Sequence, residues 1–354
     1  MRKKVNHAKS FAIGKIVTAL QAQFFSQTIT QFKLSLAQIH SGLLLASGVA
    51  AIAYLLRLAP GFNLLSPLIL AILLGILVRN TIGAAPKCQA GIQFAMRRIL
   101  RFAVALLGVQ LSLLQVLSVG MTGLMIASVT LLGTFWLTCW MGERLGVNSG
   151  LVRLIAAGTS ICGASAVIAT STTTQNSDED IAYAVGIVTL FGTISMLFYP
   201  LLTGQLKPEA FGLWCGVSIH EVAQVIAAAF QASPISGEIA TISKLSRVLW
   251  LAPIILMLGT VSKASHPKSQ VTFPWFIACF MLLILLNSLN LIPHALKMII
   301  GQFNQVLLTL SMAAMGLETR LNQIQRIGLK PLYLGAISWL FISIVSYGLI
   351  QVFY

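Results

Sequence analysis

The sequence predicts an all-α polytopic membrane protein. Hydrophobic residues make up 57% of the 354 residues, charged residues make up 9%, and the mean hydropathy is +0.89. Soluble domains usually carry about a quarter charged residues, so this composition excludes a soluble globular chain. Long apolar runs and an uneven distribution of basic residues support the same class, as shown below.

Apolar stretches close to the roughly 20 residues that cross the hydrocarbon core recur along the chain. They predict eleven spans in order, at residues 36–58, 62–83, 98–118, 121–141, 151–171, 181–203, 211–231, 242–262, 272–291, 296–317 and 331–353. Residues 36–354 therefore form one transmembrane domain, preceded by a basic segment at 1–35. In that segment Phe11, Ile16, Leu20 and Phe24 recur at near-helical spacing. This pattern predicts an amphipathic helix on the inner leaflet, with a poorly ordered basic tail as the alternative.

Basic residues fix the expected orientation. With the N-terminus inside, the cytoplasmic segments hold all but four of the 23 lysines and arginines. The exceptions are Arg57, Lys244, Arg247 and Lys297. Since cytoplasmic loops are enriched in Lys and Arg, this asymmetry supports a cytoplasmic N-terminus and a periplasmic C-terminus. It also accounts for the net charge of +15 without nucleic acid, which we do not expect as a partner.

An internal repeat joins the two halves of the chain. The segment Ala105 to Gly120 aligns with Ala313 to Gly328 at a constant offset. The matched pairs are Ala105 and Ala313, Gly108 and Gly316, Leu113 and Leu321, Gln115 and Gln323, Gly120 and Gly328, and upstream Pro67 and Pro274, Ala71 and Ala278, Asn80 and Asn287. The matched helices are separated by an odd number of spans, so they run in opposite directions. This predicts inverted-topology repeats, which place a substrate site near the membrane midplane.

Two further segments resemble each other, GTSICGASAVIA at Gly158 to Ala169 and GVSIHEVAQVIA at Gly216 to Ala227. Both put small or polar residues where a spanning helix should be most apolar. Such residues predict interrupted helices near the midplane, because free backbone groups persist there only against protein or a wet cavity. The span count makes the two segments parallel, so they form an inverted pair only if one of them is re-entrant.

The second segment contains the most informative trio, His220, Glu221 and Gln224. Glu221 is the only acid in the middle of a predicted span, and a buried acid costs on the order of 3 kcal/mol on insertion scales. His220 can titrate near neutral pH, and Gln224 lies about one helical turn further on the same face. We expect a proton- or cation-coupling site; the alternative is a structural pair that fixes helix packing.

The first segment is the candidate anion site. Its small and polar residues could expose backbone N–H groups at a helix break, which attract anions, although small residues also allow close helix packing without a ligand. These residues are Gly158, Thr159, Ser160, Cys162, Gly163, Ala164 and Ser165. Lys244 and Arg247 lie one turn apart at the outer start of the predicted span 242–262. They could form an anion-attracting mouth, or extend to lipid headgroups instead.

Other chemistry finds little support. The five cysteines show no CxxC pair and no metal-ligand spacing, so we infer no disulfide framework and no metal site. Glu318 and Asn287 are weaker candidates for polar ligands within the repeat. No nucleophile elbow, HExxH or phosphate loop is present, and we expect neither an enzyme nor a cofactor.

Taken in order, AAGTSICGASAVIA, an acidic loop, Tyr199–Pro200, SIHEVAQV and KLSRV resemble the YeiH-like family of bacterial proteins proposed to export sulfate. The resemblance covers the chain beyond residue 36. It implies an inner-membrane transporter similar in fold to bile-acid symporters and sodium/proton antiporters. Its motifs fall on Gly158 to Ser165, His220, Glu221, Gln224, Lys244 and Arg247.

Together these observations predict a secondary transporter that exports a small anion, sulfate or an organic sulfonate, by alternating access. The expected partners are that anion, a coupling proton or sodium ion, and the lipid bilayer; a homo-oligomer is compatible with the sequence. A sodium-coupled organic-anion importer and a passive anion channel are the alternatives.

Overall fold

A computed structural model describes residues 39–59, 61–62, 65–174, 176–251, 253–254, 257, 275–319 and 328–354. Within these ranges the regular structure is helical throughout, without a strand. After a first helix, Ile39–Leu56, the elements are α2 (Pro67–Thr81), η1 (Pro86–Cys88), α3 (Gln89–Phe94), η2 (Ala95–Ile99), α4 (Leu100–Leu107), α5 (Leu113–Arg144), α6 (Ser149–Ser160), α7 (Ala164–Thr174), α8 (Asp178–Phe198), η3 (Tyr199–Gln205), α9 (Pro208–Ser218), α10 (Val222–Ala232), α11 (Pro234–Leu249), α13 (Trp275–Ser288), α14 (His294–Glu318) and α16 (Leu329–Phe353). The segment 1–35 lies outside the described residues.

Local sequence signals set several helix starts. Ser66 caps α2, its hydroxyl accepting from the N–H of Ile69, and Pro67 occupies the first turn, where its missing N–H costs nothing. Ser177 caps α8, whose first turn holds the acidic run from Asp178 to Asp180. Carboxylates are favourable at this end of a helix because of the helix dipole. The acidic loop of the sequence is therefore the start of a long apolar helix.

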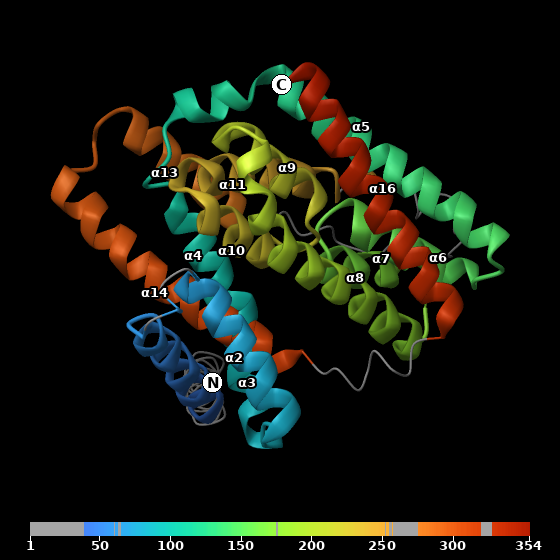
Figure 1. Cartoon of the computed structure of the whole chain (residues 1–354), viewed down its shortest axis with the longest axis horizontal. Coiled ribbons are helices and arrows are strands. Elements are labelled where there is room, and N and C mark those ends of the chain that lie inside the picture. Colours follow the sequence, from blue (N-terminus) through green and yellow to red (C-terminus); the bar gives the residue numbers. More distant parts are fainter. Residues whose placement is uncertain are drawn as a thin grey trace, which may run out of the picture.

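The helices form two groups (Figure 1). The first, called here the α2–α14 group, contains the helix Ile39–Leu56 with α2, α3, α4, α13 and α14; α2 packs on α14 and α4 packs on α13. The second, the interrupted-helix group, runs from α6 to α11. Helices α5 and α16 lie side by side along its outer edge, in contact with α6 and α9.

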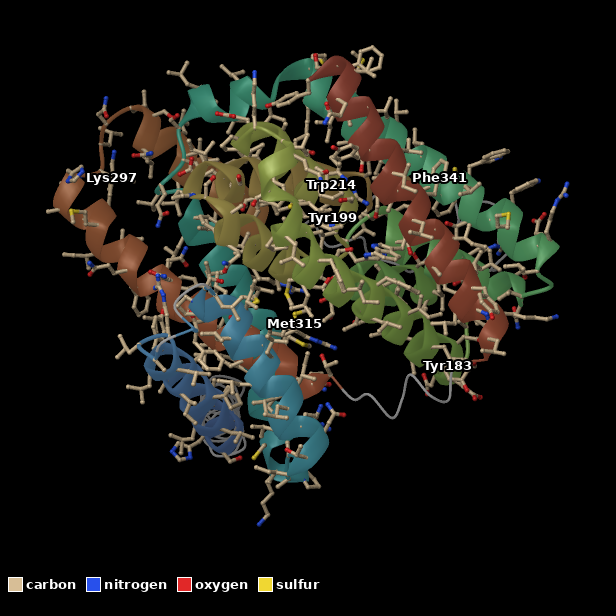
Figure 2. All side chains as sticks on the ribbon, viewed as in Figure 1. Tyr183, Tyr199, Trp214, Lys297, Met315 and Phe341 are labelled. Carbon is tan, nitrogen blue, oxygen red and sulfur yellow. The ribbon has the colours of Figure 1, made fainter. Side chains whose placement is uncertain are left out.

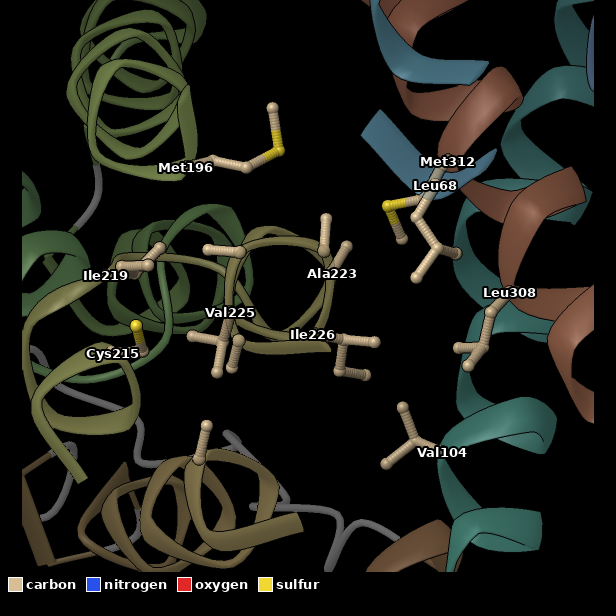
Figure 3. Close-up of a cluster of buried hydrophobic side chains, with 14 of the residues drawn as sticks. Leu68, Val104, Met196, Cys215, Ile219, Ala223, Val225, Ile226, Leu308 and Met312 are labelled. Atoms are coloured by element: carbon tan, nitrogen blue, oxygen red, sulfur yellow. The ribbon is translucent and has the colours of Figure 1, made fainter. Parts of the chain in front are cut away.

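The two groups meet through apolar side chains. Ala223 and Ile226 of α10 face Leu68, Leu308 and Met312 of α2 and α14 across their interface (Figure 3). All five residues are buried. Helix α10 thus contributes one face to the boundary with the α2–α14 group while its N-terminus belongs to the site described below.

Helices α2 and α14 approach each other closely. A Cβ atom built on Gly75 would lie 2.9 Å from the Gly316 Cα and 2.6 Å from the Ala313 carbonyl oxygen. Only glycine at both positions permits this backbone contact, because small residues let helices pack at short distance. The crossing therefore depends on a pair of glycines contributed by the two halves of the chain.

The same set of contacts occurs a second time between α4 and α13. A Cβ on Gly316 would meet the Ile72 carbonyl oxygen and Gly75, and a Cβ on Gly108 would meet the Phe280 carbonyl oxygen and Leu283. Ile72 corresponds to Phe280, Gly75 to Leu283, and Gly108 to Gly316. The same number of residues separates the two members of each pair. Two hydrogen bonds correspond at nearly that offset: Asn80 Nδ2 donates to the Thr319 carbonyl at 3.1 Å, and Asn287 Nδ2 donates to the Leu111 carbonyl at 2.7 Å.

Aromatic residues fix α16 against η3 and α9. The rings of Tyr199 and Trp214 stack with centroids 3.8 Å apart (Figure 2). Tyr199 Oη hydrogen-bonds the Ser343 hydroxyl at 2.7 Å, and Trp214 Nε1 donates to the Ser343 carbonyl at 2.9 Å. Buried aromatic groups with satisfied polar atoms make a rigid joint at this position.

Five helices of the described residues are long and apolar enough to cross a membrane: Ile39–Leu56, Val119–Arg144, Asp178–Gln205, His294–Glu318 and Leu329–Phe353. The all-helical membrane class is thereby supported. Two predicted spans were placed wrongly. The stretch 98–118 is not one helix, since α4 ends at Leu107 and Gly120 leaves the helical conformation with φ 62°. The helix predicted at 242–262 begins earlier, at Pro234, after the capping residue Ser233.

Candidate functional site

The first look-alike segment is an interrupted helix. Helix α6 ends at Ser160, and α7 begins at Ala164 after a turn in which Gly163 adopts φ 72°, a conformation that favours glycine. A Cβ on Gly158 would lie 2.7 Å from Val167 Cγ2. In an unbroken helix these residues would be separated by about 13 Å, so the chain bends sharply between them.

The second segment is interrupted in the same way. Helix α9 ends at Ser218, Ile219 and Glu221 are extended, and α10 begins at Val222. Glu221 caps α10 and forms a capping box with Gln224, whose Oε1 accepts the Glu221 N–H at 3.2 Å. His220 therefore lies outside the helix. The prediction that His220 and Gln224 share one helical face is wrong, because the break separates them.

The two interruptions touch each other at Gly163 and Glu221. A Cβ on Gly163 would lie 2.5 Å from Glu221 Cγ, so the carboxylate side chain packs directly on the first break. The Glu221 carboxylate also accepts from the backbone N–H of Ala164 and, at 3.2 Å, from the Thr189 hydroxyl. One carboxylate thus contacts the N-terminal ends of both α7 and α10, where a negative charge is favourable.

Helix α8 supplies a polar face that the sequence analysis did not identify. Gln224 Nε2 donates to the Thr189 carbonyl at 3.2 Å and to the Thr193 hydroxyl at 3.3 Å. Its amide fills the space beside Gly192, where any Cβ would overlap it. Thr189, Gly192 and Thr193 recur at helical spacing within an apolar helix, and this pattern could have revealed the face.

Lys244 and Arg247 do not lie at an outer mouth; this part of the prediction is wrong. Both side chains are 0% exposed, in the second half of α11. Lys244 Nζ donates to the carbonyls of Ile161, at 3.0 Å, and Ile219, at 2.7 Å. Since α11 begins at Pro234, these residues lie one turn apart deep within the protein, where extension to lipid headgroups is excluded.

Arg247 binds the C-terminal ends of both interrupted helices. Its Nε donates to the Ser160 carbonyl at 3.1 Å, and Nη2 donates to the carbonyls of Thr159 and Ser160. Its Nη1 donates to the carbonyls of Gly216 and Val217. A cation is favourable at the C-terminus of a helix, where backbone carbonyls lack intrahelical partners. Lys244 and Arg247 therefore compensate two helix ends at once.

Some polar side chains in this region have no hydrogen-bond partner. Both ring nitrogens of His220 and the hydroxyls of Thr159 and Ser160 are unpaired, and all three residues are 0% exposed. Elsewhere a buried hydroxyl bonds a carbonyl one turn back, as Thr134 and Ser346 do. Leaving such a group unpaired costs about 1–3 kcal/mol, so these atoms are energetically unfavourable exceptions among the buried polar groups.

Part of the site is exposed at the surface of the protein. Glu221, Ala164, Thr189 and Thr193 are partly exposed, and Ser165 is exposed, whereas Cys162 and Gly163 are buried. The predicted anion-site residues consequently divide into a buried set before Ala164 and an accessible pair at the start of α7. The accessible pair lies beside the Glu221 carboxylate.

Three other groups have local roles. Glu318 accepts from Gln89 Nε2 at 2.8 and 2.6 Å, and Asn287 holds the Leu111 carbonyl. The five cysteines are free thiols. In the part of the chain that the structure describes, no group of three or more His, Cys, Asp or Glu residues could hold a metal ion.

Comparison with known proteins identifies the family of this chain. Residues 41–335 match the family described as conserved hypothetical protein 698. The chain is 36% identical to the UPF0324 inner membrane protein YeiH of Salmonella typhimurium, over 92% of this chain and 96% of that protein. It is 37% identical to the protein of the same name from Escherichia coli, over 78% of this chain and 84% of that protein. A UPF0324 membrane protein of Photorhabdus laumondii is 37% identical over 87% and 91%.

Proposed function

Because the chain belongs to the UPF0324 family of inner membrane proteins, we propose that it is a secondary transporter exporting a small oxyanion, sulfate or an organic sulfonate, by alternating access. The observation that carries this proposal is the meeting of two interrupted helices at Gly163 and Glu221. In transporters, interrupted helices at membrane depth form the substrate and coupling-ion sites. No cofactor is required.

The anion binds where the N-terminal ends of α7 and α10 converge. Backbone N–H groups and the helix dipoles favour negative charge there, and the exposed Ser165 adds a hydroxyl donor. Lys244 and Arg247 hold positive charge behind the breaks without contacting the accessible face. The arrangement favours an anion over a cation as substrate.

Glu221 is the coupling residue. It is a partly exposed carboxylate between two helix N-termini, and an ionisable group at membrane depth marks a proton or ion path by default. His220, buried next to it with both ring nitrogens unpaired, is the second candidate proton carrier. Gln224 positions Glu221 through the capping box.

The repeated contacts of Gly316 with Ile72 and Gly75, and of Gly108 with Phe280 and Leu283, support inverted repeats. Exchanging the two halves of the chain reproduces the same packing, as expected for a pseudo-two-fold axis. With the distribution of basic residues, the proposal includes a cytoplasmic N-terminus, a periplasmic C-terminus and about eleven spans.

The test is flux of radiolabelled sulfate in proteoliposomes under an imposed pH gradient. Wild-type protein should accumulate sulfate in response to the gradient, and uptake should saturate. Glu221→Gln keeps the shape of the side chain but removes its charge, so it should lose the gradient response. Glu209→Gln, at an exposed acid of α9, is the matched control and should behave as wild type.

Gradient-driven transport that is equal in Glu221→Gln and wild type would refute the coupling role. Flux that rises without saturation would favour a passive anion channel. A response to sodium in place of protons would favour the sodium-coupled importer.

A further inference from the structure

The ends of the interrupted helices are the places where a transporter of this design would bind a metal cation. Unwound backbone carbonyls and the C-terminal ends of half-helices coordinate sodium in such proteins, while the N-terminal ends bind anionic groups. A cation can therefore be bound where the two interrupted helices cross only if some of these carbonyl oxygens are free.

The carbonyls at both breaks are already bound by side chains of the protein. Six carbonyl oxygens accept hydrogen bonds from α11, namely those of Thr159, Ser160, Ile161, Gly216, Val217 and Ile219. The donors are the ammonium of Lys244 and the guanidinium of Arg247, both fully buried. Positively charged side chains therefore already occupy the carbonyl oxygens of each break that could otherwise bind a metal cation.

The opposite ends of the crossing are unsuitable for a metal cation for a different reason. The N-termini of α7 and α10 present N–H groups and a positive dipole end, and the Glu221 carboxylate already accepts from Ala164 N–H and the Thr189 hydroxyl. The groups near Glu221 are His220, its neighbour in the chain, Cys162 of the first break, Lys244 of α11 and the uncharged Thr189 of α8.

We propose that Lys244 and Arg247 are tethered cations that take the place of a coupling sodium ion at the crossing of the two interrupted helices, so that the coupling ion is the proton. Lys244 is the closer analogue of an ion, because a single Nζ atom bridges Ile161 of the first break and Ile219 of the second. Arg247 extends across both breaks with a planar fork. The inference rests on the proposed function and selects between its two coupling ions.

Equilibrium binding of radiolabelled sodium to the purified full-length protein tests this without a transport substrate. Wild-type protein should show no saturable sodium binding above a choline background. Lys244→Met keeps a long apolar stem but frees the two bridging carbonyls, and should gain saturable sodium binding. Arg98→Met, at an exposed arginine, is the matched control and should resemble wild type.

Saturable sodium binding by wild type would overturn the inference, and so would folded Lys244→Met that binds no sodium. Should Lys244→Met fail to fold, thermal unfolding of the wild type in sodium and in potassium chloride decides: equal midpoints support the inference and a sodium-specific rise refutes it. Absence of sulfate flux would refute the proposed function and leave the sodium result unaffected.

Discussion

Replacing Arg247 with methionine should strongly destabilise the protein. The guanidinium gives five hydrogen bonds to four carbonyl oxygens at the ends of α6 and α9. Each hydrogen bond to a charged group contributes about 1.5–3 kcal/mol, but water entering the vacated space replaces part of this sum. We therefore expect a loss of about 3–5 kcal/mol in the free energy of unfolding, which is large against a total of about 5–15 kcal/mol.

The assay is thermal unfolding of the detergent-purified protein. At roughly 2–4 °C per kcal/mol, Arg247→Met should lower the midpoint by about 10 °C. The midpoint of Arg247→Lys should lie between those of wild type and Arg247→Met, because an ammonium has three donors and cannot reproduce the planar fork. Arg98→Met, at an exposed arginine, should have the same unfolding midpoint as the wild type. An Arg247→Met variant as stable as wild type would refute the role of Arg247 in holding the two helix ends.

Two glycines give further tests. Gly75→Val places side-chain atoms against the Gly316 backbone and should lower the free energy of unfolding by about 1–3 kcal/mol. The control is Gly48→Ala, where a Cβ meets nothing within 4 Å, so its stability should be unchanged or higher. Equal thermal midpoints for Gly75→Val and wild type would contradict the close crossing of α2 and α14. Gly192→Ala should displace the Gln224 amide, which positions Glu221. We expect a clear loss of sulfate flux in proteoliposomes with only a small fall in the thermal unfolding midpoint. A loss of flux that is matched by a large fall in the midpoint would point to packing alone.

Sequence patterns located the interruptions but not their connections. The run of small residues from Gly158 to Ser165 indicated a break, and Gly163 at φ 72° confirms why glycine is needed there. The spacing of His220 and Gln224 predicted a shared helical face, although Glu221 followed three residues later by Gln224 also matches a helix N-terminus. The break decides between these interpretations, and only the fold shows it.

The error at Lys244 and Arg247 has a definite origin. The span was placed by hydropathy at 242–262, which put two cations at its end, but Ser233 followed by Pro234 is a helix-start signal that extends the helix upstream. Their carbonyl partners lie in segments far away along the chain, at Ser160 and Val217. No pattern within α11 specifies these contacts, because they depend on how the two interrupted helices cross.

The fixed charges at the crossing connect the substrate to the coupling ion. Lys244 and Arg247 contribute two positive charges, Glu221 contributes one negative charge when ionised, and the helix ends are locally balanced by these groups. Protonation of Glu221 would remove the negative charge of the site and free the N–H groups of α7 and α10 from an internal carboxylate. In the proposed transporter a divalent oxyanion therefore binds best when Glu221 is protonated, and Glu221→Gln should bind sulfate independently of pH.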